Sequence, residues 1–168
     1  MHDSLHTSDR TRLRTECLRS NKLRTYNTLF SPFIPHSDIV SYTRLCMPFV
    51  QRKKLSQLRL GCLPLRIETA RYTRPILPAD QRYCLQPECE NTTANLADRE
   101  KQVEDELNFL INCSQYKGLR QELFNRIYIS SFQNVSDHDM FVFLLTTKHI
   151  AQNVSQFIVD AFDTRPIK

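Results

Sequence analysis

The sequence predicts a mainly α-helical fold, a small helical domain with an irregular segment near its centre. Apolar residues recur at spacings of three and four over much of the chain, as on the buried face of a helix. No stretch alternates polar and apolar residues convincingly, as a half-buried strand would. Ser or Thr stands at the start of several periodic segments, where helices take their N-caps.

The 168 residues divide into an arm and one domain. Residues 1–21 are polar, rich in Arg and without an apolar period, which predicts a flexible basic arm. Residues 22–168 form the helical domain, which is long enough to bury one core. The helices expected within it are, in order, 22–30, 38–46, 49–60, about 98–112, 114–129, 136–146 and 147–162.

Prolines, a serine and a glycine set the ends of the first three helices. Pro32 ends the first, because proline lacks the amide hydrogen that a helix interior needs. Ser37 is the expected N-cap of the second. Pro48 stands at the start of the third, where the first turn tolerates proline, and Gly61 terminates it.

A connector and a turn separate these helices from the later ones. Residues 61–82 contain three prolines and predict an extended connector, with a short helical segment over 67–72. Cys84 and Cys89 then flank a turn. The final helices begin at Ser or Thr residues, and two of them carry apolar series at helical spacing: Leu119, Leu123, Phe124 and Ile127, then Ile150, Val154, Phe157, Ile158 and Ala161.

The composition excludes several classes of protein. Only two glycines occur, Gly61 and Gly118, so neither a P-loop nor a dinucleotide-binding loop can be built. The longest apolar runs fall far short of the roughly 20 residues that cross a bilayer, so no membrane span is expected. The first thirty residues lack the apolar stretch of a secretory signal, which predicts an intracellular location, in the nucleus or cytoplasm.

The net charge of +5 is unevenly divided along the chain. Residues 1–75 hold 14 Lys or Arg against 5 Asp or Glu, whereas residues 76–168 hold 9 against 13. A basic half is what a protein that binds a phosphate backbone needs, because each neutralised phosphate releases counterions. The alternative is a solvated basic surface, and charge alone favours that alternative.

Six cysteines in a reducing compartment are expected to be thiols or metal ligands. Cys84 and Cys89 stand five positions apart, a spacing at which two thiolates can reach one ion. Cys113 follows downstream, but no histidine stands at a matching distance. At most three thiols are therefore available locally for a site that usually has four ligands.

Three segments of the chain carry a recognisable pattern. They are KKLSQLRLGCLPLRIETARYTR over 53–74, RYCLQPEC over 82–89 and VEDELNFLINCSQYKGLR over 103–120. Together they resemble the zinc-binding tail that follows the polymerase in non-LTR retrotransposon reverse transcriptases. The resemblance covers roughly residues 22–165 and implies a zinc knuckle at 82–113 that serves structure.

In that family the metal ligands follow the order Cys, Cys, His, Cys, and the His directly precedes a Phe-Leu pair. The resemblance implies the ligand positions Cys84, Cys89, Asn108 and Cys113, so Asn108 stands where the family has His. An amide oxygen is a poorer zinc ligand than an imidazole nitrogen, which leaves three thiolates with water or a carboxylate, for which Glu104 and Glu106 are near in sequence. The alternative is a set of half-buried thiols in a relic of the knuckle, and the missing fourth ligand favours it.

The resemblance also implies a non-catalytic module that binds RNA or DNA. No pair of aspartates resembles a polymerase site: the acids Glu104, Asp105 and Glu106 lie on an expected helix, and Asp137 and Asp139 lie at a helix N-terminus. Tyr72 and Tyr83 could stack on bases. The candidate phosphate contacts are Arg52, Lys53, Lys54, Arg59, Arg66, Arg71 and Arg74.

Two other interpretations stay open. The first is a helical protein-interaction module without nucleic-acid affinity, and the second is a decayed fragment. An interaction module would dock its partner through Phe132, Phe141, Phe143, Phe157 and Phe162, although aromatic residues at helical spacing more often form a core.

Overall fold

The computed structural model describes residues 12, 15–16, 24–29, 45–89, 102–128 and 135–165. Its α-helices are α2 (Arg24–Leu29), α4 (Phe49–Arg59), α5 (Arg66–Thr69), α7 (Lys117–Arg126), α8 (Asp137–Thr146) and α9 (Ala151–Asp163). Shorter turns of 3₁₀ helix cover Ala79–Gln81, Ser114–Tyr116 and Lys148–Ile150, and a π-helical turn covers Asn108–Asn112. The predicted mainly helical fold is confirmed, since the described residues contain only one isolated β-bridge.

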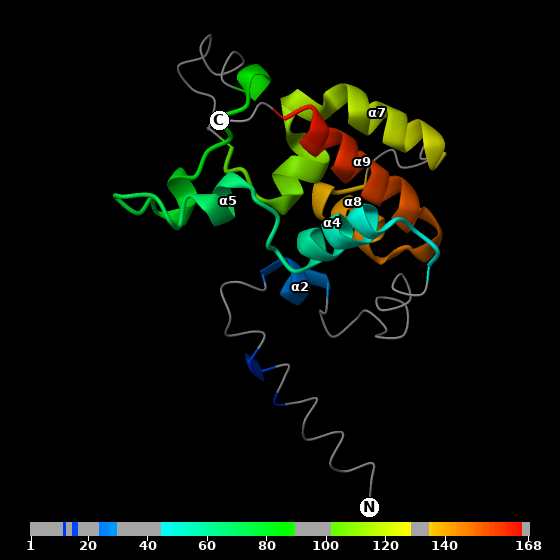
Figure 1. Cartoon of the computed structure of the whole chain (residues 1–168), viewed down its shortest axis with the longest axis horizontal. Helices are drawn as coiled ribbons and strands as arrows, with labels where there is room; N and C mark the ends of the chain where they lie inside the picture. The colour runs from blue at the N-terminus through cyan, green and yellow to red at the C-terminus, as the bar shows by residue number, and fades with distance from the viewer. Residues whose placement is uncertain are drawn as a thin grey trace, which may run out of the picture.

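Helix α9 organises the core. It contacts α4, α7 and α8, and Figure 1 shows it lying between α7 and α4. Its buried residues include Val154, Phe157, Ile158 and Ala161, which confirms the apolar series predicted for this segment. The spacing of three and four places these side chains on one face of the helix, where they are removed from water.

Local signals set several helix ends as predicted. Ser136 caps α8, because its hydroxyl oxygen accepts a hydrogen bond from the backbone N–H of Asp139 at 3.1 Å. Pro48 precedes α4, and Gly61 follows it with φ of 67°, a conformation that favours glycine. The connector 61–82 has the predicted short helix, although α5 begins at Arg66 and ends at Thr69.

One predicted helix is wrong in part. The segment expected to be helical over about 98–112 is extended at 102–105 and becomes helical only at Glu106. The cause is tertiary pairing: Val103 forms an antiparallel bridge with Tyr83, and the N–H of Glu104 donates to the carbonyl of Arg82 at 3.0 Å. Pairing with the residues beside Cys84 thus takes precedence over the local helical pattern.

Other expectations fall partly or wholly outside the described residues. The arm 1–21 lies outside them except at Arg12, Thr15 and Glu16, and the helix 38–46 except for its last two residues, which are not helical. The helix expected over 114–129 begins with a 3₁₀ turn and its α-helical part ends at Arg126. No helix in the described part of the chain is both long enough and apolar enough to span a membrane.

Four of the five phenylalanines considered for partner docking pack in or against the core. Phe141 and Phe157 are buried, and Phe143 and Phe162 pack against the core cluster from its edge. Phe132 lies outside the described residues. The helical spacing of these side chains is therefore explained by internal packing.

Candidate metal centre

Three cysteine thiols converge at one end of the helical domain. The Sγ atom of Cys113 lies 3.8 Å from that of Cys84 and 3.4 Å from that of Cys89, and all three lie within 4.8 Å of one another. A tetrahedral zinc ion with bonds of about 2.3 Å to sulfur would separate its sulfurs by about 3.8 Å. A disulfide needs about 2.05 Å, so these are free thiols whose spacing suits one shared metal ion.

Each cysteine is fixed by its own backbone contacts. The N–H of Cys84 donates to the carbonyl of Gln102 at 3.1 Å, and the N–H of Cys89 donates to the carbonyl of Gln86 at 2.9 Å. Cys113 ends the π-helical turn, where its N–H donates to the carbonyl of Asn108 at 2.7 Å. π-Helical turns are rare in proteins, and those that occur often lie at functional sites. This one sets the position of the Cys113 thiol.

The thiols also polarise one another. Hydrogen bonds from Cys113 and then Cys84 lower the pKa of the Cys89 thiol to about 2, with further support from the backbone at Gln115 and Ser114. The same sulfur contacts raise the pKa of Cys84. One negative charge is therefore favoured within the cluster of three thiols, and a thiolate is the form of cysteine that binds metals.

A buried arginine, Arg120, bonds to the backbone next to the third thiol, that of Cys113. Arg120 donates from Nε to the carbonyl of Leu110 and from Nη2 to the carbonyl of Cys113, both at 2.9 Å. Burial lowers the pKa of this guanidinium, while the negative charge of Cys113 and Cys89 opposes that change. Arg120 therefore satisfies the end of the π-helical turn and places a positive charge near the thiols.

A second set of buried polar contacts, made by Glu104 and Arg82, joins the connector to the segment before the π-helical turn. The carboxylate of Glu104, which is 1% exposed, accepts from the N–H of Arg66 at 2.8 Å and pairs with Arg165 at 2.9 Å. Arg82 donates to the carbonyl of Leu77 at 2.8 and 3.0 Å and to that of Ile67 at 2.7 Å. These bonds explain how the acid Glu104 and the arginine Arg82 can be buried in this part of the structure.

No carboxylate or imidazole of the described residues joins the three thiols as a fourth ligand. Glu104 is engaged by Arg66 and Arg165, and Glu106 is buried with contacts of its own. Asn108 is 6% exposed, and its Nδ2 donates to Oε1 of Gln102 at 2.5 Å. Its Oδ1 atom is buried and has no hydrogen-bond partner in the described part of the chain.

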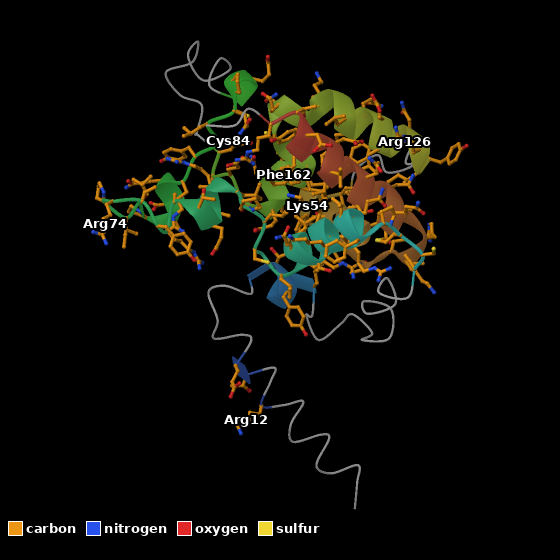
Figure 2. The ribbon with its side chains drawn as sticks, in the orientation of Figure 1. Arg12, Lys54, Arg74, Cys84, Arg126 and Phe162 are labelled. Carbon is orange, nitrogen blue, oxygen red and sulfur yellow. The ribbon has the colours of Figure 1, made fainter. Side chains whose placement is uncertain are left out.

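Three of the predicted phosphate contacts on α4 take part in packing. Arg59 is 4% exposed and donates to the carbonyl of Leu145, so its guanidinium faces the interior rather than a ligand. Arg52 is half-buried and donates to backbone carbonyls at the entry to α4. The ammonium of Lys54 lies 3.9 Å from the ring centroid of Phe162, an arrangement that suits a cation–π contact. Both residues are labelled in Figure 2.

The other predicted contacts differ in exposure. Lys53 and Arg74 are exposed, and Figure 2 shows Arg74 at the tip of the connector, far from α4. Arg66 is half-buried, and Arg71 pairs with Glu68 at 3.3 Å. Tyr72, two positions before Arg74 in the chain, is 73% exposed, whereas Tyr83 is half-buried in the β-bridge.

Sequence reasoning missed the structural role of Arg120, although a signal for it exists. Tyr116, Arg120 and Leu123 stand at spacings of four and three, and all three are buried. Arg59 follows Leu55 by four positions in the same way. A basic residue on the apolar face of a helix therefore predicts a buried guanidinium that bonds to backbone carbonyls.

Comparisons with models of protein families, with curated proteins and with solved structures find no match to this chain.

Proposed function

We propose that this chain is a non-catalytic nucleic-acid-binding module, derived from the tail of a non-LTR retrotransposon reverse transcriptase and stabilised by a structural zinc ion. The observation that carries the proposal is the convergence of Cys84, Cys89 and Cys113, the three cysteines that the resemblance marks as ligands. Zinc would join the turn at 84–89 to the end of the π-helical turn, and would contribute folding free energy there.

The nucleic-acid part of the proposal is supported by charge and exposure. The first 75 residues carry the large basic excess, and Lys53 and Arg74 are exposed. Tyr72 is exposed and stands two positions before Arg74 in the chain, and an aromatic ring and a guanidinium on one segment suit stacking and phosphate contact on a single strand. Arg59 is not among the proposed contacts because its guanidinium is buried.

Zinc is tested by elemental mass spectrometry of the purified chain and of two variants. We expect one zinc per chain, lost in Cys84→Ser together with thermal stability. Cys62→Ser is the matched control, because Cys62 is an exposed free thiol outside the cluster, and its zinc content should equal that of the wild type. A chain without zinc, whose melting is indifferent to chelator, would contradict the structural zinc.

Nucleic-acid binding is tested by fluorescence anisotropy with labelled single-stranded RNA and DNA at several salt concentrations. Phosphate-driven affinity must fall steeply as salt rises. The double variant Lys53→Ala, Arg74→Ala should reduce the salt slope by about one for each lost contact. The matched control is Lys148→Ala, which removes an exposed charge that is not one of the proposed contacts and should leave the slope unchanged.

A helical protein-interaction module remains the second candidate, and one observation favours it. Phe49 and Val50, neighbours in the first turn of α4, are 77% and 53% exposed. Two adjacent exposed apolar side chains are typical of contact surfaces, although they make a small patch. If the chain shows no salt-dependent binding of RNA or DNA, the protein-interaction module becomes the proposed function.

A further inference from the structure

We propose that Asn108 supplies the fourth ligand of the metal centre through Oδ1, so that the site binds its ion with three sulfurs and one oxygen. The inference rests on the proposed zinc site and adds its coordination and its exchange behaviour. The ion is a divalent, thiophilic ion that accepts tetrahedral coordination, which describes zinc and the spectroscopic probe cobalt.

The amide of Asn108 is oriented in a way that leaves its oxygen available. Nδ2 is used on Gln102 at 2.5 Å, which places Oδ1 on the other branch of the amide. That oxygen is buried and has no hydrogen-bond partner among the described residues. A buried acceptor without a partner is costly in a folded protein, and coordination to a cation would remove the cost.

Asn108 is also bonded to both segments that carry the thiols. Its backbone carbonyl accepts from the N–H of Cys113 at 2.7 Å. Its side chain donates to Gln102, and the backbone carbonyl of Gln102 accepts from the N–H of Cys84 at 3.1 Å. Gln102 thus resembles the outer hydrogen-bond partners that orient ligands in metal sites.

The choice of ligand has a chemical consequence. Structural zinc sites have four ligands, and zinc accepts oxygen at about 2.0–2.2 Å beside sulfur. A neutral amide oxygen donates more weakly than a thiolate or an imidazole. The centre should therefore exchange its ion with solution more readily than a site closed by a fourth strong ligand.

The test is a cobalt titration of the full chain followed by absorption spectroscopy. Thiolate-to-cobalt charge-transfer bands report sulfur ligation, and the visible d–d bands report the number and kind of ligands. Two variants of nearly the same shape separate the roles of Asn108: Asn108→Leu removes the ligand, and Asn108→Asp offers a charged oxygen. Asn112→Leu is the matched control, because Asn112 lies in the same π-helical turn and bonds to Asp137 instead.

We expect Asn108→Leu to weaken cobalt binding about tenfold or more and to change the d–d bands while the charge-transfer bands remain. Asn108→Asp should bind more tightly than the wild type and exchange its cobalt for added zinc more slowly. Asn112→Leu should match the wild type in affinity and spectrum. Circular dichroism checks that each variant is folded.

Two results overturn the inference in different ways. Wild-type affinity and wild-type d–d bands in Asn108→Leu would show that Asn108 is no ligand, while the zinc site itself stands. Absence of charge-transfer bands in every chain would overturn the zinc site and the inference together. Should Asn108→Leu fail to fold, Asn108→Asp decides, because unchanged affinity and bands in that variant contradict ligation.

Discussion

Two regions of this chain are held together by different physical interactions. One is the helical bundle, in which α4, α7 and α8 pack on α9, and the other is the thiol end, the region around Cys84, Cys89 and Cys113. In the bundle, α4, α8 and α9 meet through buried side chains such as Leu58, Leu144 and Ile158, each 0% exposed. At the thiol end, Arg82 and Glu104 are buried on irregular segments, and Arg120 is buried at the side of α7 that faces them. The bundle gains stability from apolar area, whereas the thiol end depends on directional bonds to specific carbonyl and carboxylate oxygens.

This difference predicts unequal tolerance to substitution. Apolar packing is distributed over many contacts, so the loss of one side chain costs free energy in proportion to the cavity that remains. A buried polar network loses more than one bond when a member is removed, because the remaining partner keeps its desolvation cost. The thiol end should therefore respond strongly to the loss of single polar groups, whereas the bundle is mostly apolar, although Arg59 and Ser155 are also buried there.

The largest effect is expected in the bundle, at Ile158→Ala. Ile158 is fully buried on the core face of α9, so the variant leaves a cavity and should lose about 4 kcal/mol of unfolding free energy. Urea unfolding followed by circular dichroism measures the loss. Phe49→Ala, at an exposed position of α4, is the control and should change stability by about 0.5 kcal/mol or less. A loss below about 1 kcal/mol at Ile158 would mean that α9 does not organise the core.

The next effect is expected at the thiol end, at Glu104→Ala. The variant leaves Arg165 and the N–H of Arg66 without their carboxylate and should cost about 3 kcal/mol, because one member of a buried ion pair remains. Glu122→Ala removes an exposed pair with Arg126 and should cost about 0.5 kcal/mol or less. Equal losses in the two variants would show that the Glu104 network adds nothing beyond a surface pair.

The same contrast explains which elements could be predicted from sequence. Helix α8 was predicted within a residue because its signals are local, with Ser136 as N-cap and an apolar run behind it. Within the helix expected over about 98–112, the stretch 102–105 was predicted wrongly because Val103 pairs with Tyr83, a partner twenty positions away. No local pattern encodes that pairing, so regular elements were predictable and the irregular centre was not.

The candidate site divides in a similar way. Spacing identified Cys84 and Cys89, and the resemblance added Cys113, but the convergence of the three sulfurs depends on the β-bridge and on the π-helical turn. Basic charge was visible in the sequence, yet its exposure was not. Arg59 shows this, since it counts as a positive charge in the sequence but bonds to a carbonyl inside the bundle.

A smaller effect is expected at the N-terminus of α8, where Ser136→Ala removes the hydroxyl that accepts from Asp139 N–H. The loss should be about 1 kcal/mol, the usual cost of an N-cap. Ser136→Thr keeps a hydroxyl that can accept from the Asp139 N–H and donate to Asp139 Oδ2, as Ser136 does at 3.1 and 2.6 Å, and should retain most of the stability. Both values come from urea unfolding, and equal losses in the two variants would mean that the cap bond contributes nothing.

The smallest effect is expected at the thiol end and has the opposite sign. Tyr116 is 1% exposed, its ring packs edge-on against Phe109 with centroids 5.1 Å apart, and its hydroxyl has no hydrogen-bond partner among the described residues. Tyr116→Phe keeps the ring contact and removes the unpaired hydroxyl, so it should stabilise the chain by about 1 kcal/mol or less. Urea unfolding at neutral pH measures the change. A loss of stability would instead assign the hydroxyl a bond to ordered water, which would extend the polar network of the thiol end to a group that now stands outside it.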